Sequence, residues 1–331
     1  KSQMSYGWDW AARTPTVGLA DSARLELSRG VFADEPDFRG RPDTDGSANF
    51  RASLNLTAHT NQAAEAQLCL DGVVVAQVPV TLLAGKSTAI QLIYHLSAAQ
   101  YWWPRELGEP HLYRVSLRIR AGAELLHEVE RRVGVRSIEL VKRDPASPNG
   151  KVFYFRVNGQ KLWAKGDNWL PIDFLHTRVT PAQYRGYLQL LMAGGVNLLR
   201  VWGGGIVEHD AFYDACDELG LLVWQDFQFA CGIYPEDPAF LAEVAREAED
   251  IVARLRSRTC LALWCGNNEN EALAMVTTPE KRFHPIYYQV LPEVCTRLDP
   301  ERPYWPGSPA SESRELHPDS DQEGDRHNWD V

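Results

Sequence analysis

Between about Asp21 and Val135, hydrophobic and polar residues alternate in short bursts. Apolar side chains recur at every second position in each burst, and turn residues such as Asp71-Gly72 and Ala84-Gly85 separate the bursts. Short alternating strands at this spacing are typical of an antiparallel β-sandwich. We therefore predict strands in the segments ARLELSRGVF, NFRASLNLTA, AEAQLCLDG, TAIQLIYHL and LYRVSLRIR.

After about Ile138 the pattern changes to continuous apolar runs that alternate with helical periods. The predicted helices are TPAQYRGYLQLLMAGG, with one apolar face formed by Tyr184, Tyr187, Leu188 and Leu191, then EHDAFYDACDELG, a helix from Pro238 to about Arg256, and one near 285–298. The predicted strands are KLWAKGDNW, VNLLRVW, LLVWQDF, CLALWCGNNE, PYWPGSP and HNWDV. Such alternation indicates βα units and a parallel sheet, either doubly wound or closed as a (β/α)8 barrel.

Polar or aromatic side chains follow four of these predicted strands directly. The carboxyl ends of parallel strands meet at one rim, and in a barrel this rim carries the active site. Polar loops alone explain one such strand end well and four of them poorly, so we favour the barrel. The residues expected at the rim are Asn168, Trp169, Trp202, Asp226, Asn268 and Glu269.

Composition narrows the possible partners. The 331 residues carry a formal net charge of -10, which gives no electrostatic reason to expect nucleic acid or an anionic membrane surface. No apolar run approaches the roughly 20 residues needed to cross a bilayer. VWGGGIVEHD is a glycine-rich loop without the G-x-G-x-x-G spacing, so we do not expect it to bind a nucleotide.

Metal and redox chemistry also find little support. The six cysteines form no CxxC pair, and we predict buried or unused thiols. The run HPDSDQEGDRH offers His317, Asp319, Asp321 and His327 as metal ligands, but an irregular acidic run broken by glycine is more typical of a solvated loop. We expect no metal and no cofactor. His327 and Trp329 are further candidate rim residues of a sixth strand.

Several motifs resemble the β-mannosidases of glycoside hydrolase family 2. They are SYGWDW, KGDNWLP, LLRVWGGG, VWQDF and WCGNNENE, and GNNE at the end of the fourth barrel strand is the most specific. The resemblance implies that residues 1–20 end a β-sandwich domain of sugar-binding type, that 21–137 form an immunoglobulin-like sandwich, and that 138–331 form about six strands of an incomplete catalytic TIM barrel. The opening KSQMSYGWDW has neither an initiator Met nor an apolar signal segment, so we expect the chain to begin inside a larger polypeptide and leave its compartment open.

The same resemblance implies roles for individual residues. Glu269 matches the general acid/base, and Asn268 matches the neighbour that contacts the 2-hydroxyl of the sugar. Trp202 resembles the tryptophan that lines the sugar site. Trp8 and Asp9 resemble a loop of the first domain that reaches over the barrel mouth. For Asn168 and Trp169, support of the rim and direct sugar contact are equally compatible with the motif.

Two further expectations concern the carboxylates. A general acid must stay protonated near neutral pH, and we expect desolvation beside Trp264 to raise the pKa of Glu269. Glu271 is the rival, and we expect it to be a solvated or helix-capping carboxylate. The nucleophile of the family has no match here, since SESRE at 311–315 is polar and follows no apolar strand. We expect that glutamate downstream of this sequence and the 331 residues alone to be inactive.

The resulting hypothesis is an exo-acting, retaining β-mannosidase that hydrolyses terminal β-D-mannose from oligosaccharides or glycan-derived mannosides. Two alternatives remain. One is another family 2 activity, such as a β-glucuronidase, β-galactosidase or exo-glucosaminidase. The other is a non-catalytic, carbohydrate-binding fragment.

Overall fold

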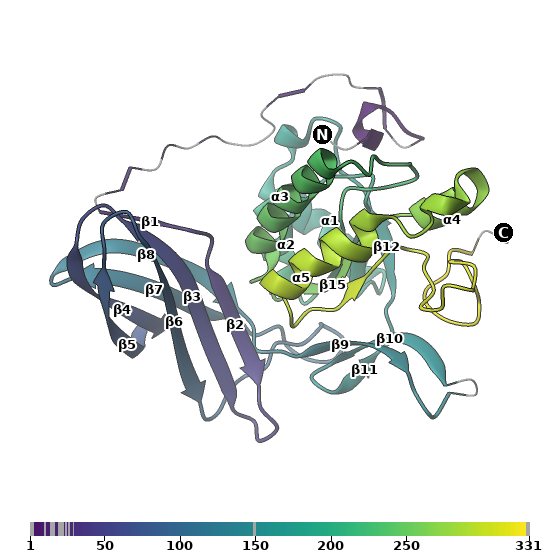
Figure 1. Cartoon of the computed structure of the whole chain (residues 1–331). Coiled ribbons are helices and arrows are strands. Elements are labelled where there is room, and N and C mark those ends of the chain that lie inside the picture. The colour runs from purple at the N-terminus through teal and green to yellow at the C-terminus, as the bar shows by residue number, and fades with distance from the viewer. Residues whose placement is uncertain are drawn as a thin grey trace. The chain divides into compact units, whose positions relative to one another are not determined.

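The chain divides into two compact units. The computed structural model describes residues 3–9, 11–13, 17–18, 23, 25, 27–28, 30–147 and 150–328. The first, the βα unit, combines Lys1–Asp21, Ile138–Val252 and Cys260–Val331 (Figure 1). The second, the sandwich unit, combines Ser22–Ser137 and Ala253–Thr259. The three-domain division with boundaries at 20/21 and 137/138 stays a prediction.

The sandwich unit contains two four-stranded antiparallel sheets. In one sheet, β3 (Ala48–Ala58) pairs with β1 (Val31–Ala33), β2 (Asp37–Pro42) and β6 (Ser87–Leu96). The other sheet has the order β5 (Val73–Leu82), β4 (Gln62–Leu70), β7 (Tyr113–Ala121) and β8 (Glu124–Val133).

Alternation explains how these sheets share one core. Every second residue of β3 is buried, from Ala48 through Phe50 to Ala58, and this face lies in one cluster with Leu68 of β4 and Leu117 of β7. The predicted strands therefore form where expected, with one exception. ARLELSRGVF contributes only its last two residues to β1, because its Leu25 and Leu27 are 85% and 87% exposed and pack against no sheet.

The βα unit begins with an antiparallel meander that the apolar pattern did not reveal. It comprises β9 (Ile138–Arg143), β10 (Lys151–Val157) and β11 (Gln160–Leu162). Asn158 and Gly159 join β10 to β11 with φ of 47° and 78°, the left-handed pair that a two-residue hairpin turn requires. KLWAKGDNW, predicted as one strand, is consequently split between β11 and the parallel strand β12 (Gly166–Trp169).

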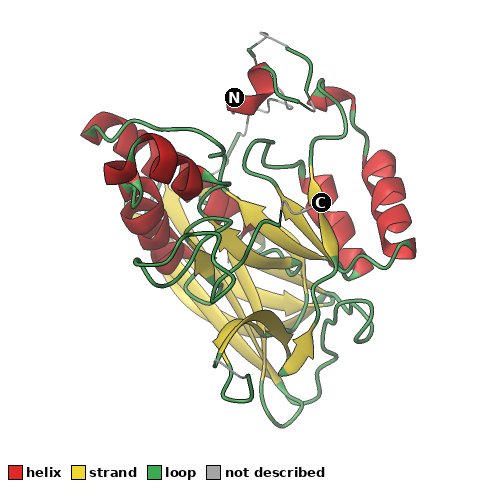
Figure 2. Ribbon diagram, turned by 90° about the vertical axis from the view of Figure 1, so that its right-hand side faces the viewer, coloured by secondary structure: helices red, strands yellow, loops and turns green. Residues whose placement is uncertain are grey.

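The parallel sheet follows the order of the chain. Its strands are β12, β13 (Leu198–Val201), β14 (Leu222–Asp226), β15 (Leu261–Cys265) and β16 (Tyr304–Trp305). Every residue of β13, β14 and β15 is buried, as expected for strands that are covered on both faces. Figure 2 shows the helices grouped around these strands.

The helices that connect the strands largely follow the predicted segments. They are α1 (Pro181–Ala193), α2 (Asp210–Leu219), α3 (Pro238–Leu255), α4 (Asn270–Thr277) and α5 (Leu291–Leu298). The predicted apolar face of α1 is only partly buried, because Tyr187 is 49% exposed whereas Tyr184 and Leu188 lie in the core. No helix in the described part of the chain is long and apolar enough to span a membrane.

Of two predictions near the end of the chain, one is confirmed and one needs correction. The helix predicted near 285–298 is present as a π-helical turn, Ile286–Val290, followed directly by α5. Pro292 lies in the first turn of α5 and has no N–H to donate, and the carbonyl of Tyr287, five residues before it, accepts the Tyr304 hydroxyl at 2.7 Å. HNWDV was predicted as a strand, but His327 and Asn328 are not in one, and Trp329–Val331 lie outside the described residues.

Candidate active site

The segment that follows β15 is held between its two neighbours as an extension of the parallel sheet. The N–H of Asn268 donates to the carbonyl of Phe229 at 2.9 Å, and the N–H of Cys231 donates to the carbonyl of Asn268 at 2.9 Å. On the other side, Glu269 donates to the carbonyl of Ser308 at 3.0 Å. Backbone bonds on both sides therefore fix the position of Asn268 and Glu269.

The outer two amides of GNNENE are structural. Asn267 is 2% exposed; its Oδ1 accepts the N–H of Asn270 at 3.0 Å, and its Nδ2 donates to the carbonyl of Pro306 at 2.9 Å. The Nδ2 of Asn270 donates to the Tyr287 hydroxyl. These bonds close the turn from β15 into α4, which explains why a buried strand can end in amides without leaving polar atoms unpaired.

Glu269 occupies an unusual backbone conformation at the start of α4. Its φ and ψ are 61° and 7°, in the left-handed region that residues with a Cβ rarely adopt. The helix begins directly after it, and the N–H of Leu273 donates to its carbonyl at 2.9 Å. This kink separates the direction of the Glu269 side chain from the helix, and such outliers are often found at functional sites.

Arg200 connects three of the strand ends from within the sheet. Its Nη2 donates to Asp226 Oδ2 at 2.8 Å and to Asn268 Oδ1 at 3.0 Å, and its Nε donates to Asp226 Oδ1 at 3.2 Å. The Arg200 and Asp226 side chains are 9% and 0% exposed. Asp226 also accepts the N–H of Gly203 at 3.0 Å. Asp226, expected at the rim, is thus an internal ion-pair partner that orients Asn268.

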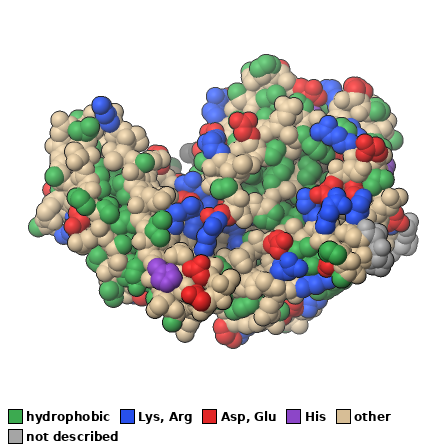
Figure 3. Space-filling view, turned by 60° about the horizontal axis from the view of Figure 1, so that its bottom comes forward, with side chains coloured by type: hydrophobic (Ala, Val, Ile, Leu, Met, Phe, Trp, Pro, Cys, Tyr) green, Lys and Arg blue, Asp and Glu red, His purple; other side chains and the backbone are tan. Residues whose placement is uncertain are grey.

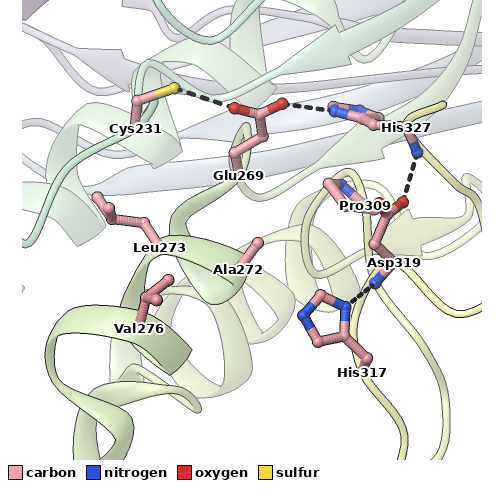
Figure 4. Close-up of a pocket in the computed structure, with 9 residues that line it drawn as sticks. All are labelled: Cys231, Glu269, Ala272, Leu273, Val276, Pro309, His317, Asp319 and His327. Atoms are coloured by element: carbon pink, nitrogen blue, oxygen red, sulfur yellow. Dashed lines mark hydrogen bonds and ion pairs between the residues drawn. The ribbon is translucent and has the colours of Figure 1, made fainter. Parts of the chain in front are cut away.

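Glu269 has a partner at each carboxyl oxygen. Its Oε1 lies 2.7 Å from Nδ1 of His327, and its Oε2 lies 3.5 Å from Sγ of Cys231 (Figure 4). Burial raises the pKa of Cys231 to about 11, and the Glu269 charge adds to the effect, so the thiol stays protonated at neutral pH and donates to Oε2.

The electrostatic setting of Glu269 differs from the expectation. The hydrogen bond to His327 lowers the pKa of Glu269 below its ordinary value, and this outweighs the opposing effect of burial. Trp264 does not supply the expected apolar neighbour. It is fully buried beneath the site, donates through Nε1 to Asp299 at 2.9 Å, and stacks on Phe227.

A cavity of about 420 Å³ opens beside Glu269. Figure 4 shows Glu269 and His327 on one side of it. The apolar part of its wall comes from α4 and from Pro309. The full lining consists of Cys231, Glu269, Ala272, Leu273, Val276, Pro309, His317, Asp319 and His327. The volume lies within the range of small-molecule sites, roughly 300 to 1,000 Å³.

Trp202 is packed close to this region, and glycines make room for it. It is 8% exposed and clusters with Met4 and Ala230. A Cβ on Gly204 would lie 1.9 Å from the Trp202 ring, and one on Gly203 would lie 2.6 Å from the carbonyl oxygen of Phe229. Gly204 is therefore required by the close packing of Trp202, and Gly203 by the backbone carbonyl of Phe229.

The remaining predicted site residues lie apart from the cavity. Trp8 is 42% exposed and pairs with Ala11 through two backbone hydrogen bonds; Asp9 is exposed beside it. Asn168 is exposed on the edge strand β12. Trp169 is buried, and its Nε1 donates to Glu208 at 2.8 Å. None of these four lines the cavity beside Glu269.

The loop that offered metal ligands is occupied with its own hydrogen bonds. The N–H of Asp319 donates to His317 Nδ1 at 3.1 Å, the N–H of His327 donates to Asp319 Oδ1 at 2.7 Å, and Asp321 is exposed. In the described ranges, no three His, Cys, Asp or Glu residues are grouped to hold a metal ion. Basic and acidic side chains lie next to one another on the face in Figure 3.

Comparison with known proteins gives this geometry a context. Residues 35–136 match the family model described as glycosyl hydrolases family 2. This stretch of the chain is therefore similar to that family. Over its whole length, this chain is 34% identical across 350 residues to beta-mannosidase B of Aspergillus niger, and 35% identical across 353 residues to beta-mannosidase B of Thermothelomyces thermophilus. Each match covers 100% of this chain but 40% of the relative, so the chain spans about 40% of the length of the curated relatives it matches.

Solved structures give a similar picture. The crystal structure of a beta-D-mannosidase from Dictyoglomus thermophilum is similar to this chain with a TM-score of 0.92 and 36% identity, over 100% of this chain and 41% of that one. An exo-chitosanase from Amycolatopsis orientalis has a TM-score of 0.71 at 18% identity, over 86% of this chain and 32% of its own. The second similarity is one of fold alone.

Two buried glutamates lie outside the lining of the cavity. Glu208, which sequence reasoning missed, accepts from Trp169 and from the Tyr184 hydroxyl at 2.5 Å, and burial raises its pKa. Glu271 was expected to be solvated or to cap the helix. It is 3% exposed instead, because Arg282 donates to its Oε1 at 2.8 Å and Tyr288 to its Oε2 at 2.5 Å.

Proposed function

We propose that this chain carries the acid/base half of an exo-acting, retaining β-mannosidase. The observation that supports this most directly is the position of Glu269. It lies at the carboxyl end of a buried parallel strand, faces a cavity, and follows Asn268, which Arg200 orients. The similarity of this whole chain to part of proteins named as beta-mannosidases supports the proposed sugar preference.

The proposed chemistry requires two carboxylates about 5 to 5.5 Å apart. Glu269 gives its proton to the leaving oxygen while the nucleophile attacks the anomeric carbon. In the second half-reaction, Glu269 takes a proton from the water that releases mannose. We propose that the nucleophile belongs to a segment outside this sequence. The other carboxylate at the cavity is Asp319, and it accepts the backbone N–H of His327, a residue of its own loop.

The fold proposal extends the parallel sheet to a (β/α)8 barrel. Five parallel strands whose spatial order equals their chain order are the arrangement expected for consecutive barrel strands. A doubly wound sheet would reverse its strand order at a switch point. We propose the same family arrangement for the preceding regions, with an immunoglobulin-like sandwich over 21–137 and the end of a sugar-binding-type domain over 1–20.

A panel of nitrophenyl glycosides, assayed with the full-length protein that carries this sequence, tests the proposal. β-Mannoside should be hydrolysed with a kcat/KM well above that for β-glucuronide, β-galactoside and β-glucosaminide. A preference for any of the other three would contradict the proposed sugar specificity. Mannoside binding without turnover would favour the carbohydrate-binding alternative.

We also propose that Asp9 binds a hydroxyl of the terminal sugar. A hydrogen bond to a charged group is worth about 1.5 to 3 kcal/mol. Asp9→Ala should therefore reduce kcat/KM for mannosides by about 10- to 100-fold, because each 1.36 kcal/mol is a factor of ten in rate. Melting temperature should not change. Asp34→Ala removes an exposed carboxylate of the sandwich unit and is the control. Equal kinetics for the two variants would remove Asp9 from the site.

A further inference from the structure

The loop after β16 returns to Glu269 and is fastened at two points. Asp325 forms a bridge with Ala310, and its Oδ1 accepts the Trp305 indole N–H at 2.7 Å and the Ala310 N–H at 3.0 Å. Further along, the His327 N–H donates to Asp319 at 2.7 Å. The backbone that carries His327 is therefore tied to both arms of its own loop.

The side chain of His327 is fixed as well. The Ser308 hydroxyl donates to Asp325 Oδ2 at 2.5 Å, and Ser308 Oγ lies 3.0 Å from His327 Nε2. Arg200 Nη1 lies 3.4 Å from the same Nε2, so this nitrogen is held between the serine oxygen and the guanidinium. The ring is thereby oriented so that Nδ1 faces Glu269 Oε1 at 2.7 Å. One series of side-chain contacts, called the Glu269 series below, therefore runs from Asp325 through Ser308 and His327 to Glu269.

The order Ser–His–Glu in the Glu269 series matches the triad of serine hydrolases, but two observations argue against a nucleophilic Ser308. Its side chain belongs to a residue that is 3% exposed, so a substrate carbonyl cannot reach it. Its hydrogen is donated to Asp325, whereas a triad serine donates to the imidazole that will take its proton. The Glu269 series therefore acts on the group at its other end, Glu269.

We propose that His327 is a positioning residue for Glu269, held by Ser308 and Asp325. The inference rests on the proposed function, in which Glu269 is an acid in the first half-reaction and a base in the second. Its carboxyl must stay in place in both charge states. A ring anchored at Nε2 holds Oε1 and leaves Oε2, beside the Cys231 thiol, as the oxygen that exchanges a proton with substrate and water.

The geometry also predicts how the site responds to pH. His327 is the main cause that lowers the pKa of Glu269, and burial opposes it. Burial raises the pKa of Asp325, which lies at the other end of the Glu269 series. Other titratable or charged groups surround Glu269 and His327. They are Cys231 from the loop after β14, Arg200 from β13, Asp226 from β14, and His317 and Asp319 from the loop after β16.

The test is the pH profile of kcat/KM for nitrophenyl β-mannoside in the full-length protein. The alkaline limb of this profile reports the general acid of the free enzyme. His327→Leu should move that limb to higher pH, since the hydrogen bond that lowers the pKa of Glu269 is lost while burial remains. At the optimum, kcat/KM should fall about 10- to 100-fold from misplacement of the carboxyl.

Further variants separate positioning from mere stability. His327→Gln keeps a neutral donor and should move the limb less than His327→Leu. Ser308→Ala and Asp325→Asn keep the contact with Glu269 but loosen the ring, so each should lower kcat/KM several-fold. His284 is a matched buried histidine that bonds the Tyr234 carbonyl at 3.0 Å. His284→Gln should lower the melting temperature and leave the limb in place.

Two failures can be told apart when Glu269→Gln is assayed in the same series. If His327→Leu and His327→Gln fold and keep the wild-type limb while Glu269→Gln loses activity, the positioning proposal is wrong and the proposed function stands. The positioning proposal is also wrong if His284→Gln moves the limb as far as His327→Leu does. If Glu269→Gln is as active as wild type, the proposed function is wrong, and the role of His327 with it.

Discussion

Glu269→Gln is expected to lower kcat for alkyl β-mannosides by about 10² to 10⁴, the usual contribution of general acid–base catalysis. The amide keeps the size of the side chain but has no proton to give to the leaving oxygen. Dinitrophenyl β-mannoside should lose much less in its first step, because dinitrophenolate departs without a proton. The loss should therefore grow with the pKa of the leaving group.

The measurement is kcat/KM across a series of leaving groups, with Glu271→Gln, two positions further along, as the control. Glu271 is buried against Arg282, so its substitution should lower stability. It should not change the dependence on the leaving group, because its carboxyl is bound by Arg282 and Tyr288. A loss that is equal for dinitrophenyl and alkyl mannosides in Glu269→Gln would exclude Glu269 as the acid.

Arg200→Met is expected to lower the free energy of unfolding by about 3 to 5 kcal/mol. This is the usual cost of removing one partner of a buried ion pair, because the other charge stays buried without compensation. Asp226, with a fully buried side chain, would be that charge, and Asn268 would lose its donor. The variant should therefore lose activity together with stability.

Urea-induced unfolding, followed by tryptophan fluorescence, measures the change. Arg178→Met is the matched control, since Arg178 pairs with Asp173 at 2.6 Å but its side chain is 65% exposed. Pairs of this kind contribute about 0 to 1 kcal/mol. Similar losses for the two arginines would show that the pair inside the sheet has no special weight.

Much of the scaffold could be predicted because its strands are periodic. The alternation in β3 and the unbroken apolar run of β15 each specify one kind of burial, and the structure has both strands in those places. Where alternation was not accompanied by burial, as at Leu25 and Leu27, the prediction was wrong. The dipeptide Asn158-Gly159 is a recognisable signal of a hairpin turn, but the periodicity of apolar residues does not include it.

The candidate site was predictable only in part, because its contacts join residues that are distant in sequence. GNNE directed attention to Asn268 and Glu269, and a single arginine within the apolar run LLRVW was a visible signal of a buried partner for Arg200. Nothing in the sequence linked His327 to Glu269, which is 58 positions away. The prediction of a raised pKa for Glu269 was wrong for that reason. The sequence showed the apolar run next to Glu269 but not the imidazole of His327 that contacts it.

The left-handed backbone at Glu269 has a consequence for how this position can change over evolutionary time. A residue with a Cβ costs about 1 to 2 kcal/mol in that conformation, and glycine costs far less. Position 269 is therefore held by a glutamate against the preference of the chain. A relative released from selection for hydrolysis would gain stability by acquiring glycine or asparagine there, so that either residue in an otherwise intact motif would identify a member that has exchanged turnover for binding.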